Sequence, residues 1–492
     1  MDMKRRIRIK GWIAAAAAVS VLAAGCGVRT DTPVESGASV PQETTAAQTS
    51  EAEKPTHPEP DTIEPFPTEA PEPETVAEKP DHATRIVLMT DIHYLAGSLR
   101  DEGEAFTSMV DHGDGKLVNY VEEIVDAALE ETISQNADVL ILSGDLSLNG
   151  EEDSHRELAK KLEKVQEAGI PVLVIPGNHD INNPRAAGYQ GKDIYPAGDI
   201  DPDQFAEIYG EYGYDEAYSR DSNSLSYTYY LDQDTCLLML DTCQYEPRNL
   251  VGGMIKTETY EWIEAQLDEA EEAGMRILPV AHHNLLDESK VYVDDCTIEH
   301  SDRLIDMLEE RNIPLFLSGH LHVQHFMQHD DIGIYEVVTS SLATPPCQYG
   351  VLDYMSDESF SYRTRQVDME RWAKRHHVTD ENLLSFDTYS PPTLNKIFYN
   401  QAYDAMKDSK EEEKPGDLFV KLTLSEKQQM SQVYADINAA CYAGKAVDVV
   451  EEATGRPAYK MWQEYCYPAV LFEYLEYIVE DAVKDYNVLE VD

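Results

Sequence analysis

The sequence predicts an α/β fold followed by an α-helical extension at the C-terminus. From about Arg85 onward, short apolar runs alternate with amphipathic segments of helical periodicity. Several of the apolar runs end in polar residues of the types that bind metals. From about Thr364 onward, the pattern is helical and no β-rich runs remain. Repeated strand–helix–strand units are typical of layered α/β cores, which is why this fold class is preferred.

The chain has 492 residues, too many for one ordinary domain and enough for two domains with accessory segments. Hydrophobic residues make up 42% of the chain, so a sizeable core can be buried. We predict four segments: a lipoprotein signal peptide over 1–26, a disordered acidic linker rich in Pro, Glu and Thr over 27–82, an α/β domain over 83–362, and an α-helical extension over 363–492.

The N-terminus has the pattern of a secretion signal. Basic residues between Lys4 and Lys10 precede an apolar stretch from Trp12 to Ala24, which is too short to span a membrane comfortably. The small residues directly before Cys26 resemble a bacterial lipobox. This resemblance implies an extracytoplasmic protein, anchored to the cell membrane only through lipid on Cys26. An ordinary secretory signal with an incidental cysteine is the alternative.

The segment that follows has the composition of a linker. Pro, Glu, Thr, Ala and Ser dominate residues 27–82, and Phe66 is the only aromatic residue there. Such a segment cannot bury enough apolar surface to offset its ordering entropy. Repeated Pro-Glu steps favour an extended chain, so we expect a tether that holds the folded part away from the membrane.

The elements of the folded part follow from apolar periodicity. Strands are expected over 85–91, 137–143, 171–176, 226–231, 236–240, 276–281, 315–318 and 334–339. Helices are expected between them over 116–134, 154–168, 257–273 and 303–311. In the extension, helices are expected over 369–375, 394–405, 425–442 and 461–483. The aromatic residues of the last helix are expected to belong to a core rather than to a ligand site.

Charge and cysteine content limit the classes of function. The formal net charge is −54 at pH 7, from 93 acidic and 39 basic residues. This charge repels nucleic-acid backbones and anionic membrane surfaces, so binding to a nucleic-acid duplex is not expected. A phosphate substrate is not excluded, because bound metal ions invert the local field. The sequence does not distinguish disulfides from buried free thiols at the remaining cysteines, which are Cys236, Cys243, Cys296, Cys347, Cys441 and Cys466.

Polar residues of metal-ligand type follow five of the predicted strands. In open α/β sheets, sites form in the crevice at the carboxyl ends of strands, so these residues are expected to converge. Each motif alone is a weak signal, but five of them in order at strand ends are unlikely to arise by chance. The motifs are Asp91-Ile92-His93, Gly144-Asp145, Gly177-Asn178-His179-Asp180, His282-His283 and Gly319-His320-Leu321-His322.

This ordered set resembles the calcineurin-like metallophosphoesterase family, and the resemblance covers about residues 85–355. It implies a four-layer α-β-β-α sandwich that holds two divalent transition-metal ions. It also implies which motif residues would bind the ions. One ion would be bound by Asp91, His93 and His322, and the other by Asn178, His282 and His320. Asp145 would bridge both ions. His283 is the alternative to His282. His179 would act as the catalytic acid, with its imidazole oriented by Asp180.

The resemblance also implies a function, the metal-dependent hydrolysis of small phosphate esters by a hydroxide bridging the two ions. Mixed imidazole and carboxylate ligands suit Mn, Fe, Zn or Co. Leu148 stands where purple acid phosphatases carry a tyrosine ligand, which argues against that branch. Monoesters and diesters both stay open, because the loops over 96–115 and 182–224 carry no readable motif. The alternative function is a catalytically inactive surface lipoprotein that binds a solute or a protein partner.

Overall fold

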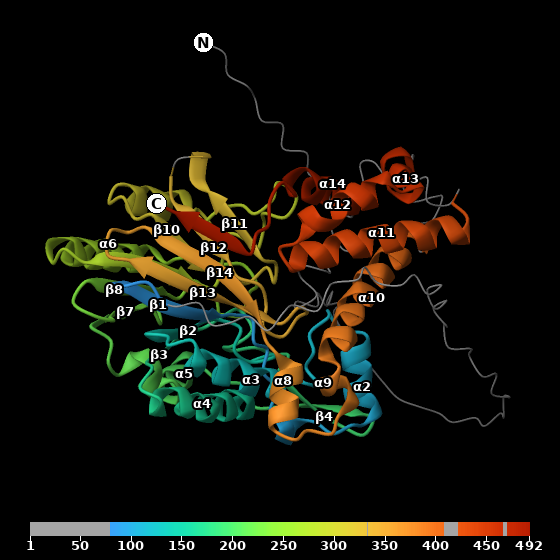
Figure 1. Cartoon of the computed structure of the whole chain (residues 1–492). Coiled ribbons are helices and arrows are strands. Elements are labelled where there is room, and N and C mark those ends of the chain that lie inside the picture. The colour runs from blue at the N-terminus through green and yellow to red at the C-terminus, as the bar shows by residue number, and fades with distance from the viewer. Residues whose placement is uncertain (1–78, 332, 408–421, 466–469) are drawn as a thin grey trace, which may run out of the picture.

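The computed structural model describes residues 79–331, 333–407, 422–465 and 470–492 (Figure 1). The predicted signal peptide, including Cys26, lies outside the described residues. The same holds for the predicted linker up to residue 78 and for Cys466.

The α/β part is built on two large sheets. Within the described residues, the first sheet has the strand order β15-β14-β13-β1-β2-β3, and the second has the order β11-β12-β10-β9-β8-β7-β6. The first sheet contains β1 (Ala83–Met89), β2 (Val139–Ser143), β3 (Val172–Ile175), β13 (Gln348–Met355), β14 (Phe360–Gln366) and β15 (Val488–Val491). The second contains β6 (Ser219–Arg220), β7 (Tyr227–Tyr230), β8 (Thr235–Leu240), β9 (Arg276–Ala281), β10 (Leu315–Ser318), β11 (His325–Gln328) and β12 (Tyr335–Val338).

Helices cover the outer faces of both sheets (Figure 1). The helices of this part are α2 (Glu104–Asp111), α3 (Val121–Ser134), α4 (Glu152–Glu167), α5 (Pro202–Ile208), α6 (Thr257–Glu272) and α7 (Asp302–Glu309). A small hairpin, β4 (Ala187–Gln190) and β5 (Asp193–Pro196), lies in the segment for which the sequence predicted only a loop. The short turns η1 (Gly97–Leu99), η2 (Gly210–Tyr214) and η3 (His329–Asp331) complete the connections.

The alternation of side chains along β8 explains the four layers. Leu237 and Met239 belong to the core that the two sheets share with α3 and α4. Leu238 and Leu240 point the other way and pack in the core formed with α6 and α7. Because successive strand residues face opposite sides, one apolar strand can fill both interfaces. The predicted α-β-β-α sandwich is confirmed.

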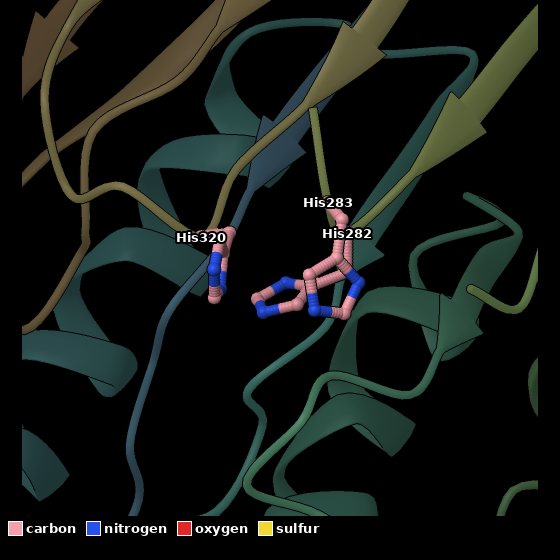
Figure 2. A group of neighbouring side chains, drawn as sticks. All are labelled: His282, His283 and His320. Carbon is pink, nitrogen blue, oxygen red and sulfur yellow. The ribbon is translucent and has the colours of Figure 1, made fainter. Parts of the chain in front are cut away.

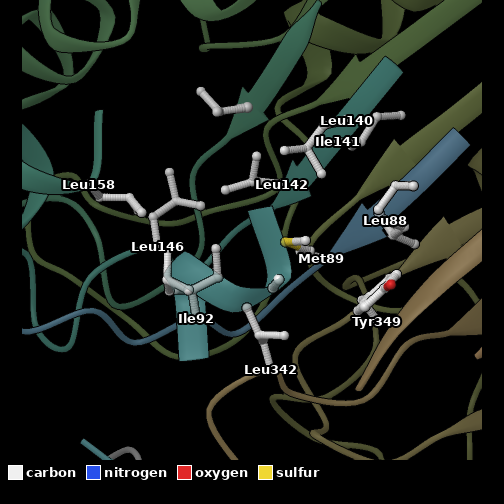
Figure 3. Close-up of a cluster of buried hydrophobic side chains, with 14 of the residues drawn as sticks. Leu88, Met89, Ile92, Leu140, Ile141, Leu142, Leu146, Leu158, Leu342 and Tyr349 are labelled. Atoms are coloured by element: carbon white, nitrogen blue, oxygen red, sulfur yellow. The ribbon is translucent and has the colours of Figure 1, made fainter. Parts of the chain in front are cut away.

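Parallel pairing brings the ends of the metal-ligand strands together. In the first sheet, β2 pairs in parallel with β1 and β3, with Met89 opposite Leu142 and Ser143 opposite Ile175. In the second sheet, β9 and β10 are parallel, with Leu317 opposite Val280. Figure 3 shows the apolar side chains of β1 and β2 packed behind these strand ends. The fold therefore places the five motifs of the sequence at adjacent carboxyl ends.

The C-terminal extension has its own core on one side of the sandwich (Figure 1). Its helices are α8 (Met369–Arg375), α9 (Glu381–Leu384), α10 (Phe386–Lys407), α11 (Leu424–Tyr442), α12 (Ala446–Gly455), α13 (Pro457–Tyr465) and α14 (Val470–Asp481). Trp462 is fully buried in that core and donates its indole hydrogen to the Met430 carbonyl at 2.9 Å. The aromatic residues of the last predicted helix thus belong largely to a core, as expected.

The structure differs from the predicted elements in the C-terminal third. β-structure does not stop near Thr364, because β14 runs to Gln366 and β15 pairs with it to extend the first sheet. The helix predicted over 461–483 is divided between α13 and α14, and α9 and α12 were not predicted. α10 begins at Phe386 instead of residue 394. The five described cysteines form no disulfide with one another. Among the described helices, none has the length and apolar character needed to cross a membrane.

Candidate metal centre

The backbone turns sharply at most of the predicted ligands. Asp91, His93, Asp145, His320 and His322 all have positive φ angles, between 47° and 71°. Residues other than glycine rarely adopt this left-handed conformation, and where they do the strain tends to mark functional sites. The motifs that follow β1, β2 and β10 therefore leave their strands through strained turns, which the surrounding sandwich holds in place.

Two glycines of the motifs are required by these turns. Gly144 has a φ of 98°, and a Cβ atom there would lie 2.5 Å from His282 Nδ1. A Cβ atom on Gly319 would lie 2.0 Å from Thr90 Oγ1 and 2.9 Å from Asp91 Oδ2. Real Cβ atoms essentially never approach other atoms this closely, so the segments carrying the ligands pack together only without side chains at these positions. This explains why glycine precedes Asp145 and His320.

We expect the Gly319→Ala variant to lose much of its metal affinity. The new methyl group must push Thr90 or Asp91 aside, and Asp91 is a predicted ligand. When the contacts that support metal ligands are lost, metal affinity typically falls by about 10-fold to 100-fold. Metal content after dialysis at graded free Mn²⁺ measures the effect. Gly169→Ala is the control, because a Cβ atom there meets nothing within 4 Å, although its φ of 85° adds strain. Equal metal affinity in the two variants would contradict the expectation.

One group of ligand atoms forms around the end of β1. Asp91, His93, Asp145 and His322 each offer an atom within 4.8 Å of the others. His93 Nε2 lies 3.1 Å from His322 Nε2, 3.8 Å from Asp91 Oδ1 and 3.8 Å from Asp145 Oδ2. His322 Nε2 lies 3.2 Å from Asp91 Oδ1. Two imidazole nitrogens and two carboxylates thus converge on one point.

A second group forms at the ends of β3, β9 and β10. His282 Nε2 lies 3.2 Å from Asn178 Oδ1 and 3.5 Å from Asp145 Oδ1. The rings of His282 and His320 are 5.1 Å apart between centroids, and Figure 2 shows them facing the same space. Asp145 belongs to both groups, because Oδ2 faces His93 and Oδ1 faces His282. The structure thus brings all seven predicted ligands together, with Asp145 between the two groups.

Hydrogen bonds distinguish His282 from its neighbour His283, although both rings lie near His320. His282 Nδ1 donates to the Ser143 carbonyl at 2.9 Å, which leaves Nε2 facing the site. His283 Nε2 donates to the Val251 carbonyl at 2.8 Å, and its Nδ1 accepts from the Thr242 hydroxyl at 2.7 Å. Both nitrogens of His283 are therefore occupied by protein partners.

From this difference we expect opposite results from two alanine variants. His282→Ala should reduce the metal content measured by mass spectrometry, because it removes the Nε2 atom that lies beside Asp145 and Asn178. His283→Ala should keep the wild-type metal content and mainly lower the melting temperature, since it breaks two buried hydrogen bonds. Metal loss from His283→Ala with retention in His282→Ala would reverse the assignment.

His179 lies beside the first group, with its ring centroid 4.8 Å from that of His93. Its Nδ1 donates to the Leu148 carbonyl at 2.6 Å, and its Nε2 lies 3.9 Å from Asp145 Oδ2. Burial lowers the pKa of His179 to about 4, although the charge of Asp145 acts in the opposite direction. The ring is thus fixed with Nε2 beside the ligand groups.

The predicted role of Asp180 needs correction, because the Leu148 carbonyl orients the His179 ring instead. The Asp180 carboxylate accepts hydrogen bonds from the backbone of Leu146, Ser147 and Gly177 at 2.8–3.0 Å. It therefore joins the turn after β2 to the turn after β3. Asp180 follows His179 in the sequence, which suggested a contact between the two side chains. The Asp180 carboxylate instead lies against the backbone of the two turns.

The buried charges in the two groups stabilise one another. Burial would raise the pKa of Asp145, but the charges of His179 and His282 lower it well below its usual value. Burial would likewise lower the pKa of His282, but the charge of Asp145 outweighs this and raises it to about 9. The groups therefore hold anionic carboxylates where a cation is needed to balance them.

The donor set fits divalent metal ions. His320 Nε2 donates to the Asp295 carbonyl at 2.9 Å, as His282 Nδ1 does to Ser143, and metal-binding histidines are usually held in this way. The buried Asp91 Oδ1 has no hydrogen bond within the described residues. Imidazole nitrogens combined with carboxylate oxygens suit transition metals rather than Ca²⁺.

The extension supports the loop that carries two of the ligands. His320 and His322 face the metal centre, whereas the alternate residues Leu321 and Val323 are buried in the core of the extension. In the same core lie Tyr434, Trp462 and Leu475 of the extension helices. The position of these two histidines therefore depends on the packing of the extension.

Sequence reasoning missed the residues that support the ligands. The orienting groups at Ser143, Leu148 and Asp295 are backbone carbonyls, for which a sequence carries no side-chain signal. Glu336 on β12 was also missed, although it is fully buried and accepts from the backbone of Leu285 and Leu286 at 2.8 and 2.7 Å. A glutamate within an apolar run was the only signal that could have indicated it.

Two family models match the chain. Residues 84–324 match the model described as Calcineurin-like phosphoesterase. Residues 368–485 match the model described as the C-terminal domain of cyclic nucleotide phosphodiesterase. The first match includes all seven predicted ligands, and the second lies within the helical extension.

Individual proteins of known sequence or structure are also similar. A protein of Synechococcus sp. described as a probable cyclic nucleotide phosphodiesterase is 25% identical over 195 residues. That alignment covers 39% of this chain and 61% of the relative, so the chain spans about three fifths of the relative's length. A dimetal phosphatase from Danio rerio aligns over 58% of this chain and 97% of its own, with 13% identity and a TM-score of 0.41. A purple acid phosphatase from yellow lupin aligns over 58% of this chain and 52% of its own, with 13% identity and a TM-score of 0.34.

Proposed function

We propose, from the match of residues 84–324 to the calcineurin-like phosphoesterase family model, that this protein hydrolyses phosphate esters at a centre of two divalent metal ions. The observation that carries the proposal is the position of Asp145. Its two carboxylate oxygens face two separate groups of ligand atoms, one at 3.8 Å and one at 3.5 Å. A single carboxylate between two donor groups is the arrangement that a pair of ions requires.

Each ligand group supplies the donors for one ion. Asp91, His93 and His322 would hold the first, and Asn178, His282 and His320 would hold the second, with Asp145 shared. When bound, two such ions supply a water of lowered pKa and positive charge for the oxygens of an in-line displacement. Asn178 contributes a neutral oxygen and so limits the negative charge that an anionic substrate meets.

His179 is proposed to act on the substrate rather than on a metal ion. The Leu148 carbonyl holds the proton on Nδ1, so Nε2 is the atom available to the reacting group. An anionic phosphate ester beside the ring stabilises the imidazolium and opposes the effect of burial on its pKa. Nε2 would then hold a proton that it can transfer to the leaving oxygen.

We propose phosphodiesters, and cyclic nucleotides among them, as the preferred substrate class. The C-terminal family model and the Synechococcus relative are both described in terms of cyclic nucleotide phosphodiesterase. The support is strengthened by the structure of the extension, whose core includes the residues that flank His320 and His322. The extension is therefore expected to matter for catalysis in proteins that share it.

The location is a separate proposal that rests on the sequence of residues 1–26 alone. A lipidated Cys26 would place the catalytic domain outside the cytoplasmic membrane, on a tether. Metabolic labelling with a radioactive fatty acid tests this, with Cys26→Ala as the unlabelled control. Equal label in both chains, or none in either, would refute lipidation at this residue.

The function is tested on the chain from Lys79 onward. We would quantify bound transition metals and then assay cyclic AMP, bis-p-nitrophenyl phosphate and p-nitrophenyl phosphate with added Mn²⁺. About two ions per chain together with faster diester hydrolysis is the expected result. Metal binding without turnover of any ester would favour a surface protein that binds a solute or a partner. A chain that takes up no metal would refute the proposed centre.

A further inference from the structure

The loop that follows β8 is held in shape by its own hydrogen bonds and belongs to none of the ligand motifs. Leu250 N donates to the Gln244 carbonyl at 2.8 Å, which closes the loop over residues 244–252. The Gln244 side chain adds a second bond across the loop by donating to the Gly252 carbonyl at 2.7 Å. This β8 loop, residues 244–252, can therefore fix the position of the segments that it contacts.

One side of the β8 loop is bonded to the turn that carries Asn178. The side-chain amide of Asn249 donates to the Asn178 carbonyl at 2.7 Å and to the Ile181 carbonyl at 2.9 Å. In the opposite direction, the side chain of Asn182 donates to the Tyr245 carbonyl at 3.2 Å. A single amide nitrogen has two hydrogens to donate, and both of those on Asn249 serve the turn after β3.

The other side of the β8 loop is bonded to the turn after β9. His283 Nε2 donates to the Val251 carbonyl at 2.8 Å. The packing there is close, because a Cβ atom on Gly253 would lie 2.5 Å from His283 Cγ. His283 stands beside His282, with 5.0 Å between the ring centroids (Figure 2). The β8 loop thus connects a turn of the first sheet to a turn of the second sheet.

This connection bears on the second group of ligand atoms, because its members come from both sheets. Asn178 follows β3 and His282 follows β9, and Asn178 Oδ1 lies 3.2 Å from His282 Nε2. The Asn178 oxygen carries no full charge, so it attracts a cation less strongly than a carboxylate does. Its contribution depends on being in place beforehand, since a group already in position loses little conformational freedom when the ion binds.

We propose that Asn249 is a positioning residue for the second metal ion. By holding the Asn178 carbonyl, Asn249 keeps the amide oxygen of the same residue beside His282. The inference rests on the proposed function for the second ion, and it assigns Asn249 no contact with metal or substrate. Loss of Asn249 should spare the first ion, because its ligands Asp91, His93 and His322 follow β1 and β10 rather than β3.

The test titrates the metal-free protein with Mn²⁺, followed by calorimetry and by electron paramagnetic resonance. Asn249→Ala should keep one site at its wild-type affinity and weaken the other about 10-fold to 100-fold, the range typical for loss of contacts that support metal ligands. At Mn²⁺ concentrations that fill both wild-type sites, the variant should show the hyperfine-split signal of isolated Mn²⁺. In the wild-type protein, magnetic coupling between neighbouring ions should suppress that signal.

Two further variants sharpen the result. Gln244→Ala is the matched control, because Gln244 is half-buried like Asn249 but its side chain bonds to a carbonyl of the β8 loop itself. It should keep both sites at their wild-type affinities. Asn249→Asp keeps the size of the side chain and removes both donors, so it should show the same selective loss. This variant decides the question should Asn249→Ala not fold.

The outcomes separate this proposal from the proposed function. Two sites of wild-type affinity in Asn249→Ala would overturn the role of Asn249. Equal weakening of both sites, or equal losses in Asn249→Ala and Gln244→Ala, would also overturn it, because general loosening of the loop would then explain the loss. A wild-type protein that binds two ions but hydrolyses no ester would refute the proposed function, and the titration would still judge Asn249.

Discussion

Asp145→Ala is expected to eliminate turnover and to release metal from both halves of the centre. Of the seven predicted ligands, Asp145 is the one whose carboxylate faces both sets of donors, with Oδ2 toward His93 and Oδ1 toward His282. Its Oδ1 also accepts from the backbone of His179 at 2.8 Å, so the turn that carries Asn178 loses support as well. A loss of about 10³-fold or more in kcat/KM is expected, because residues that act as one catalytic unit fail together.

Metal content and kinetics measured on the same preparation check this expectation. Asp126→Ala is the matched control, because that carboxylate pairs with Lys161 and Lys164 at 2.9 and 3.0 Å in the helical layer. The control should keep both metal content and rate. An Asp145→Ala chain with a full complement of metal and a near-normal rate would show that Asp145 does not bridge two ions.

Leu321→Ala is expected to lower both stability and metal affinity, although Leu321 touches no metal. Its side chain is 4% exposed in the core of the extension, between two predicted ligands in sequence. Removing a buried leucine side chain costs about 2–5 kcal/mol of unfolding free energy. The cavity also removes a packing contact of the loop that holds His320 and His322. Metal affinity should therefore fall about 10-fold to 100-fold, the range typical for loss of contacts that support metal ligands.

A control in the same core separates the two effects. Leu471 on α14 is 6% exposed and belongs to that core, but it lies far along the chain from any ligand. Leu471→Ala should lose comparable stability in denaturant titration while keeping its metal affinity. If both variants lost metal equally, global unfolding would explain the loss, and the specific support of the histidine loop would be refuted.

The parallel centre of the fold could be predicted from the sequence because its strands are buried on both faces. Residues Val139–Leu142 are continuously apolar, and Gly144 follows the strand, so the sequence indicates both the type of the element and where it ends. The candidate site followed from the same runs, since each motif stands directly after one. Parallel pairing then made convergence of the motifs a geometric consequence.

The antiparallel edge of the first sheet could not be predicted in the same way. β14 alternates buried and partly exposed residues, and it includes Arg363 and Arg365, so it does not stand out from a loop by composition. The buried pair of Arg85 with Asp353, at 2.6 Å, depends on the register of β1 with β13. Pairings between distant segments have no local signature, which also explains why β15 was missed.

The remaining features of the site depend on contacts between segments far apart in sequence. The choice of His282 over His283 depends on Ser143 and Val251, which lie in other segments of the chain. That choice could not be read from the spacing of residues in a motif.

The shared core around Leu321 and Val323 has a consequence for biogenesis. During synthesis, all seven ligands leave the ribosome before α11 to α14 exist, because the last ligand is His322 and α11 begins at Leu424. A nascent chain thus carries a complete set of donors whose final loop has no apolar partner to fix it. The last loop of the centre is therefore completed by a segment that is synthesised after every ligand and contributes none of them.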